Sequence, residues 1–265
     1  MKVFIEQDME GVAGVFDWAS ALAKSGKLDA AAKLMTEEVN AAVAGALAAG
    51  ASEVTALEAH EFDRLGLHPA ARLCNQPLFE VKGPADALFF VGRHAMSQVA
   101  DGILNHTGSS RSIREVRVNG RAFGELALVA AWFGNLGIPT ALVTGDEAAC
   151  REAREFFGVV ETVAVKKGTG CHKGVSLSPD EARRAIRAGA ERALRRLKEF
   201  KPFVVSGPVV LEVEYRHSEV ADWICRVPGL TRPSACTTRF ESPDYEGALR
   251  MYYAQGAMLW RFDAV

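Results

Sequence analysis

The 265-residue chain is 49% hydrophobic and 24% charged, which is typical of a globular protein and leaves room for one large α/β domain or two small ones. Its net charge of -2 and pI near 6.3, without any basic run, argue against a nucleic-acid or acidic-membrane partner. No stretch reaches the roughly 18 uninterrupted apolar residues of a membrane span, and the chain enters a strand at once, so we expect neither a membrane protein nor a secreted one.

The first third of the chain alternates strands and helices. Residues 3–5 predict a buried strand, residues 29–48 a helix that closes at Gly50, and residues 53–57 a second strand. This spacing is typical of a right-handed βαβ unit in a parallel sheet. Residues 62–76 are rich in turn formers and are expected to be irregular, and residues 85–91 predict the next strand.

Further elements continue the alternation. In chain order we expect a polar loop over 101–114, a hairpin over 115–123 with an Asn-Gly turn, a helix over 124–136, a strand over 140–143, a helix over 147–157, a strand over 159–165 and a glycine-containing loop over 166–176. A capping box at Ser178 and Glu181 starts a helix that ends near 200, residues 209–215 and 234–240 can pair as strands, and a last helix covers 245–260. The pattern predicts a three-layer αβα fold with a largely parallel central sheet.

Two carboxylates follow the first strand. Asp8 and Glu10 are two residues apart, so their side chains point to the same side of an extended chain. Like charges at a buried strand end repel each other and lose hydration, and a divalent metal is the simplest compensation. The alternative is that both residues cap the helix that follows or face water.

Other ligand-type residues are expected at the same edge of the sheet. His60 and His94 follow the second and third strands, and Glu125 lies in the first turn of the helix that Gly124 opens. The carboxyl ends of parallel strands share one edge, where ligands bind in open α/β sheets. Each residue alone also fits a structural role, as a hydrogen-bonded histidine or a carboxylate at a helix N-terminus. Together, two histidines and three carboxylates suit two metals that share a carboxylate. The absence of thiolates favours zinc, with manganese or cobalt as alternatives.

The cysteines bear on the location of the protein. The chain contains five, irregularly spaced and without a C-x-x-C pair. This pattern disfavours both a disulfide framework and a zinc knuckle, and a reduced, cytoplasmic environment fits it best.

Several motifs resemble one known family. The stretches Asp8-Met9-Glu10-Gly11, Gly92-Arg93-His94-Ala95, Asn105-His106 and Gly124-Glu125-Leu126 are similar to those of the metal-dependent D-aminopeptidases, peptidase family M55, and the resemblance is nearly colinear over the whole chain. Two positions depart from the family pattern. Leu57-Glu58-Ala59 precedes His60 where Asn-Asp-Ser is expected, and Asn105 replaces a serine that commonly precedes the catalytic histidine.

The resemblance implies roles for particular residues. Asp8 would bridge two zinc ions per subunit, Glu10 and His94 would complete one site, and His60 and Glu125 would complete the other. A histidine at the position of His106 would be catalytic, and the subunits would assemble as a homo-oligomer, a decameric ring. We therefore expect a single domain over 1–265, with a possible division into a metal-binding core (1–166) and a smaller C-terminal part (167–265).

The expected function is zinc-dependent aminopeptidase activity on short peptides. The preference for N-terminal D-residues, as in D-Ala-D-Ala, comes from the resemblance alone. Two metals would activate a water and polarise the scissile carbonyl, and His106 could deliver a proton to the leaving amine or orient the oxyanion, unless it is merely a surface histidine. A related metallo-amidase or L-aminopeptidase, a non-catalytic dipeptide-binding protein and a metallophosphoesterase are the alternatives. No Arg/Lys phosphate clamp can be placed for the last.

Overall fold

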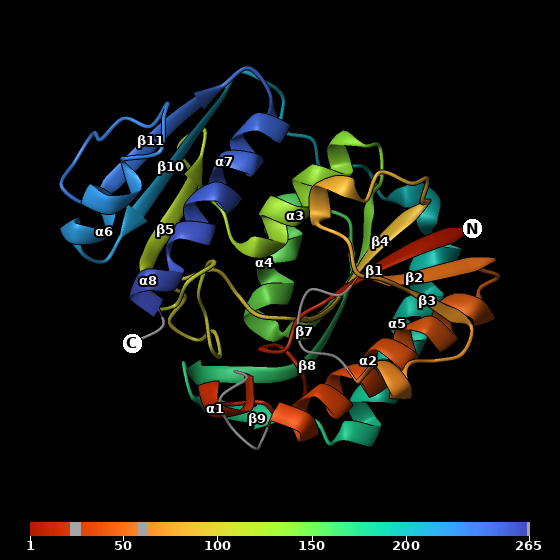
Figure 1. Cartoon of the computed structure of the whole chain (residues 1–265). Helices are drawn as coiled ribbons and strands as arrows, with labels where there is room; N and C mark the ends of the chain where they lie inside the picture. The colour runs from red at the N-terminus through yellow and green to blue at the C-terminus, as the bar shows by residue number, and fades with distance from the viewer. Residues whose placement is uncertain (22–27, 58–62, 264–265) are drawn as a thin grey trace.

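The computed structural model describes residues 1–21, 28–57 and 63–263 (Figure 1). A seven-stranded sheet forms its centre, in the order β3-β2-β1-β4-β7-β8-β9. Its strands are β1 (Lys2–Gln7), β2 (Glu53–Leu57), β3 (Ala71–Cys74), β4 (Ala87–Arg93), β7 (Thr140–Asp146), β8 (Glu161–Gly170) and β9 (Lys173–Ser176). Neighbouring strands are parallel except for the β8–β9 pair, which confirms the largely parallel sheet.

Helices cover both faces of this sheet. Figure 1 shows α2 (Leu28–Ala48) and α5 (Pro179–Arg195) together on one side, and α3 (Glu125–Asn135) and α4 (Glu147–Phe157) on the other. Alternation along β1 serves both layers, because Val3 and Ile5 pack in the core beneath α2 and α5, whereas Phe4 joins the core beneath α3. Three layers result, as the alternation of strands and helices predicted.

A second, antiparallel sheet lies beside α3, and the sequence pattern did not separate it from the first. Its order is β11-β10-β5-β6, with bounds β5 (Ile113–Val118), β6 (Arg121–Ala122), β10 (Val209–Tyr215) and β11 (Thr237–Ser242). The expected Asn-Gly hairpin and the expected strand pair are both present. α7 (Tyr245–Met258) packs between this sheet and α3, where the Tyr245 hydroxyl donates to the Leu128 carbonyl at 2.7 Å.

Short helical segments complete the described chain. They are α1 (Trp18–Ala21), η1 (Arg64–Gly66), η2 (Leu78–Glu80), η3 (Leu197–Glu199), α6 (Ser218–Ile224) and α8 (Trp260–Asp263). The capping box at Ser178 and Glu181 is present at the start of α5. None of the described helices is both long and apolar enough to cross a membrane.

Two expectations about irregular segments were wrong. β3 lies within the stretch 62–76 and pairs with the edge strand β2, although its four residues are too few and too exposed to give a periodic signal. The expected loop over 166–176 is the end of β8 and the hairpin partner β9. Gly168 has a packing role instead of a turn role, because a Cβ there would lie 2.0 Å from the Asp101 carbonyl oxygen.

Candidate metal centre and catalytic site

The parallel pairing of β1 with β4 brings the first two motifs together. Beyond the strands, the Asp8 amide donates to the Val91 carbonyl at 2.9 Å and the Gly11 amide donates to the Gly92 carbonyl at 2.7 Å. Gly92 has φ +78°, and a Cβ at this position would lie 2.1 Å from the Asp8 carbonyl oxygen. Only glycine allows these two backbone segments to approach each other this closely, so Gly92 is required for the geometry of the site.

Gly92→Ala is therefore expected to lower the free energy of unfolding by about 3 kcal/mol, through a strained backbone and a clash with the Asp8 carbonyl just past β1. Gly137→Ala is the matched control, because Gly137 has a similar φ of +82° and nothing within 4 Å of an added Cβ. It should lose only about 1 kcal/mol. Chemical denaturation measures both values, and equal losses would show that the close approach of the strands contributes nothing.

Three of the five expected ligands converge in one group. Single ligand atoms of Asp8, Glu10 and His94 all lie within 4.8 Å of one another, and all three residues are buried. The His94 Nε2 atom is 3.3 Å from Asp8 Oδ2. A second group of the same compactness contains His94, His106 and Glu125. The fifth expected ligand, His60, lies outside the described residues.

The hydrogen bonds of His94 suit metal ligation. Its Nδ1 atom lies 2.9 Å from the Ala95 carbonyl oxygen, which can only accept, so Nδ1 is the donor and Nε2 of the neutral ring carries the lone pair. Within the described chain, this buried Nε2 makes no hydrogen bond. A buried imidazole nitrogen beside two carboxylates fits a zinc ion, which binds the neutral ring, and the carbonyl behind the ring would fix its orientation.

The pKa shifts of His94 and Glu10 also favour a bound cation in this group. Burial disfavours the charged form of His94, but Asp8 and Glu125 outweigh it and raise the pKa of His94 to about 10. Burial, reinforced by Asp8, raises the pKa of Glu10 well above its usual range. Without a metal ion, the cluster thus retains protons that reduce its negative charge. A divalent cation would displace them, since ligation requires neutral imidazole and ionised carboxylate.

His106 lies at the edge of this cluster with different properties. Its ring stacks on the ring of His94, with centroids 4.1 Å apart and planes 14° apart, and Nε2 lies 3.5 Å from Glu125 Oε1. Burial and then the neighbouring His94 charge lower the pKa of His106 to about 4, so the ring is neutral at pH 7. Nδ1 donates to the Leu104 carbonyl at 2.9 Å, which leaves an Nε2 lone pair that can accept a proton.

Side chains from elsewhere in the fold hold the loops that carry these groups. The Lys166 ammonium, buried in the middle of β8, donates to the Glu10 carbonyl at 2.5 Å and to the Val15 carbonyl at 2.6 Å. On α4, the Glu152 carboxylate accepts from the Met96 amide at 2.8 Å. Sequence reasoning missed both, because Lys166 fell in a presumed loop and Glu152 in an ordinary helix.

Sequence reasoning also assigned no role to the ion pair beneath the cluster. Arg93 Nη2 lies 2.5 Å from Glu6 Oε1, and Arg93 Nη1 lies 2.8 Å from Asp8 Oδ2. All three residues are buried. One signal was available, since Glu6 and Asp8 share a face of β1 by alternation.

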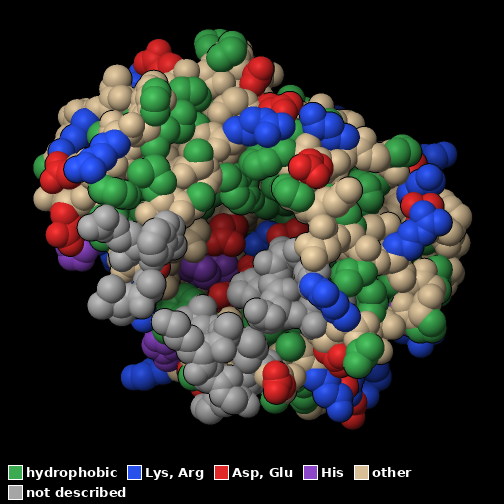
Figure 2. Space-filling model, in the orientation of Figure 1, with side chains coloured by type: hydrophobic (Ala, Val, Ile, Leu, Met, Phe, Trp, Pro, Cys, Tyr) green, Lys and Arg blue, Asp and Glu red, His purple; other side chains and the backbone are tan. Residues whose placement is uncertain are grey.

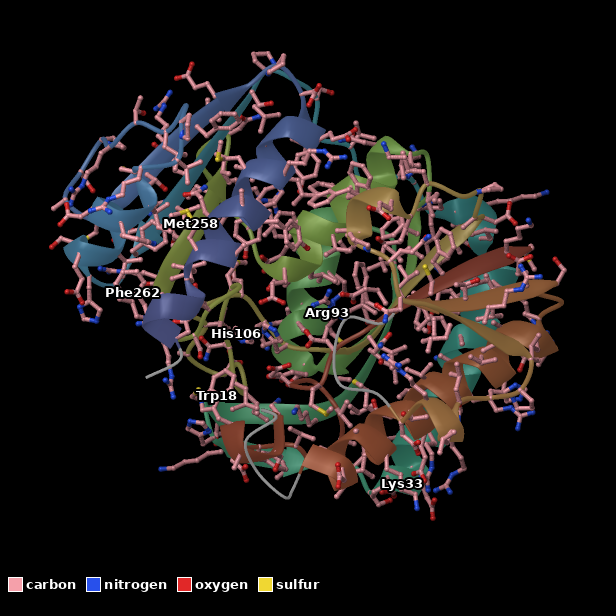
Figure 3. All side chains as sticks on the ribbon, in the orientation of Figure 1. Trp18, Lys33, Arg93, His106, Met258 and Phe262 are labelled. Atoms are coloured by element: carbon pink, nitrogen blue, oxygen red, sulfur yellow. The ribbon has the colours of Figure 1, made fainter. Side chains whose placement is uncertain are left out.

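A cavity of about 390 Å³ opens beside the cluster. Asp8, His106 and Glu125 line its polar end, while Leu78, Leu128 and Tyr252 are among its apolar walls. Figure 2 shows a central hollow with acidic, basic and histidine side chains at its floor and hydrophobic side chains on its upper wall. In Figure 3, Arg93 and His106 lie near each other at the centre of the molecule. The arrangement is a small polar centre with an adjoining apolar pocket, a common form of a small-molecule site.

Comparison with known proteins identifies the family. The family model of Peptidase_M55, described as D-aminopeptidase, matches residues 1–254. The chain belongs to the M55 peptidase family. This M55 peptidase is 31% identical to a D-aminopeptidase of Bacillus subtilis (strain 168) over 257 residues, which is 92% of each chain. It also matches a solved structure described as the Zn-dependent D-aminopeptidase DppA from Bacillus subtilis, a self-compartmentalizing protease, with TM-score 0.93, 28% identity and 98% of both chains covered.

Membership confirms the resemblance seen in the motifs and the expected fold class. As an M55 peptidase, the protein is a metallo-aminopeptidase. The dipeptide-binding and phosphoesterase alternatives are thereby set aside.

Proposed function

We propose that this M55 peptidase is a zinc-dependent aminopeptidase for short peptides with an N-terminal D-residue, such as D-Ala-D-Ala. The observation that carries the zinc assignment is the buried Nε2 atom of His94, which lies close to Asp8 and Glu10 and makes no hydrogen bond in the described chain. The zinc dependence of DppA and the D-aminopeptidase description of the family support the metal and the stereochemistry.

The residues of the site would have two roles, metal binding and proton transfer. Asp8, Glu10 and His94 would hold one zinc ion, and Glu125 with His60 would offer a second position that also uses Asp8. When bound, zinc supplies Lewis acidity that lowers the pKa of a water and polarises the scissile carbonyl. The neutral His106 ring would take up a proton at Nε2 and pass it to the leaving amine.

The cavity supplies the substrate site. Its polar end adjoins Asp8 and Glu125, where a free α-amino group and the scissile amide would lie. Its apolar walls, including Leu128 and Tyr252, would enclose the N-terminal side chain. A volume of about 390 Å³ suits a short peptide and excludes a folded protein chain.

We extend the self-assembly of DppA to this chain as part of the proposal. A homo-oligomer that encloses its active sites would admit only short peptides, in agreement with the size of the cavity. The decameric ring and the cytoplasmic location remain predictions.

A substrate panel tests the proposed function. Zinc-loaded protein should hydrolyse D-alanyl and D-phenylalanyl p-nitroanilides with kcat/KM about 100-fold above the L-isomers, because a rigid pocket tolerates only one configuration at the α-carbon. Removal of zinc by a chelator should abolish turnover, and added zinc should restore it. A preference for L-isomers would support the L-aminopeptidase alternative, and hydrolysis of simple amides but not of these substrates would support an amidase.

A further inference from the structure

Tyr252 brings a hydroxyl group from α7 to the cavity, and sequence reasoning assigned no role to this residue. The residue is 7% exposed and lines the cavity together with His106 and Glu125. Its hydroxyl oxygen lies against Gly108, because a Cβ added at Gly108 would be 2.4 Å from it. The Gly108 amide donates to Glu125 Oε1 at 2.7 Å, and this oxygen lies 3.5 Å from His106 Nε2. The hydroxyl is therefore at the end of the cavity where proton transfer is proposed.

This hydroxyl differs from those of two other buried tyrosines. Tyr215 donates to Gln255 Oε1 at 2.8 Å, and Tyr245 donates to the Leu128 carbonyl at 2.7 Å. Among the hydrogen bonds of the described residues, none engages the Tyr252 hydroxyl, which adjoins the cavity instead. Burial, and then the Glu125 charge, raise the pKa of Tyr252 well above its usual range, so the hydroxyl keeps its proton. A buried O–H without an acceptor loses free energy, which a bound ligand restores.

The polar groups described around this hydroxyl are acceptors or donors already in use. Glu125 presents carboxylate oxygens, and the neutral His106 ring presents its Nε2 lone pair. The Gly108 amide donates to Glu125 at 2.7 Å, and Arg93 Nη1 donates to Asp8 Oδ2 at 2.8 Å. Peptide hydrolysis creates negative charge on the carbonyl oxygen, which a positioned hydrogen-bond donor stabilises. The O–H of Tyr252 is suited to that task.

We propose that Tyr252 is a catalytic residue whose hydroxyl donates a hydrogen bond to the oxyanion formed at the scissile carbonyl. The inference rests on the proposed peptidase function and adds a donor from α7. As water attacks, a C–O bond forms, a water proton goes to His106 Nε2, and the carbonyl electron pair moves to the oxygen that Tyr252 contacts. The C–N bond then breaks, that pair restores the carbonyl, and His106 passes the proton to the leaving amine. Tyr252 keeps its own proton throughout.

Tyr252→Phe tests the inference, because it removes one oxygen atom and keeps the ring with its contact to Tyr253, at 5.4 Å between ring centroids. In the zinc-loaded protein, kcat on the preferred aminoacyl p-nitroanilide should fall about 100-fold, the usual effect of losing one oxyanion donor. KM should stay within about 3-fold of the wild type, since the contact strengthens only in the transition state. Zinc content and the shape of the pH profile of kcat should not change.

A binding measurement supplies a readout that a structural role would not move selectively. A dipeptide analogue with a phosphinate in place of the scissile amide carries a tetrahedral, charged oxygen at the position of the oxyanion. By calorimetry, its dissociation constant should rise about 100-fold in Tyr252→Phe, in proportion to the loss of kcat. The affinity for D-alanine, which lacks that tetrahedral centre, should be unchanged.

Tyr215→Phe is the matched control. It also removes a buried tyrosine hydroxyl, but one that is hydrogen-bonded to Gln255 within the protein. This variant should keep the wild-type kcat and phosphinate affinity. Thermal denaturation of both variants checks that they are folded.

The outcomes are distinct. Unchanged kcat and phosphinate affinity in Tyr252→Phe would overturn the inference, and so would an equal loss in Tyr215→Phe. Loss of the alkaline limb of the pH profile would make Tyr252 a proton donor and would also overturn it. A wild type that prefers L-isomers would refute the proposed stereochemistry, whereas the comparison of the two variants on those L-substrates would still decide the role of Tyr252.

Discussion

Asp8→Ala is expected to lose zinc and to lower kcat/KM by about 10⁴-fold, because both proposed metal positions use this carboxylate. Asp8 Oδ2 is the point where the His94 imidazole and the Arg93 guanidinium meet, at 3.3 Å and 2.8 Å. Its removal would leave Arg93 beside His94 without the negative charge that separates them. Metal analysis and turnover of a D-alanyl substrate measure the effect together.

Asp101→Ala is the matched control for Asp8. Asp101 pairs with Arg151 at 2.6 Å, and both side chains are more than 40% exposed. Its removal should leave zinc content and kcat/KM unchanged, because exposed ion pairs contribute little. An Asp8→Ala protein that keeps its zinc and turns over substrate normally would exclude Asp8 as a ligand.

The second large effect is expected at His106. Its replacement by alanine should lower kcat by about 10²- to 10⁴-fold through the loss of proton transfer, with zinc content retained. Retained zinc separates this variant from Asp8→Ala. Turnover and metal content should be measured on the same preparation.

His172→Ala is the control for His106, because His172 is an exposed histidine in the β8–β9 hairpin whose Nδ1 lies 3.0 Å from the Phe16 carbonyl oxygen. It should keep full activity. Full turnover in His106→Ala would eliminate the catalytic role. Loss of zinc in that variant would instead make His106 a ligand, as its grouping with His94 and Glu125 allows.

The elements that the sequence predicted well are those with a strong local signal. α2 and α5 have long helical stretches, and Ser178 with Glu181 satisfies the first amides of α5 in a pattern visible in the sequence. The Asn119-Gly120 turn marks the β5–β6 hairpin, because both residues adopt positive φ. In contrast, β3 and β9 are four-residue edge strands, and only their pairing with β2 and β8 makes them strands.

The candidate site likewise has features that the sequence predicts and features that depend on strand pairing. Asp8 and Glu10 share a side of the chain by simple alternation, and His94 follows a strand that is wholly apolar before Gly92 and Arg93. The convergence of Asp8, Glu10 and His94 then follows from the parallel pairing of β1 with β4. Their roles as ligands, and that of His60, stay predictions.

The sequence by itself determined the alternation of strands and helices, the edge of the sheet where ligand-type residues gather, and the family to which the motifs belong. These features depend on local periodicity and on residues close together in the chain. Only the tertiary structure decided that Arg93 lies on Asp8 and Glu125, that Glu6 anchors it, and that Lys166 holds the loop of Glu10. These contacts join residues from 32 to 156 positions apart. They depend on which strands are neighbours and on which charges become buried together, and no local pattern encodes either.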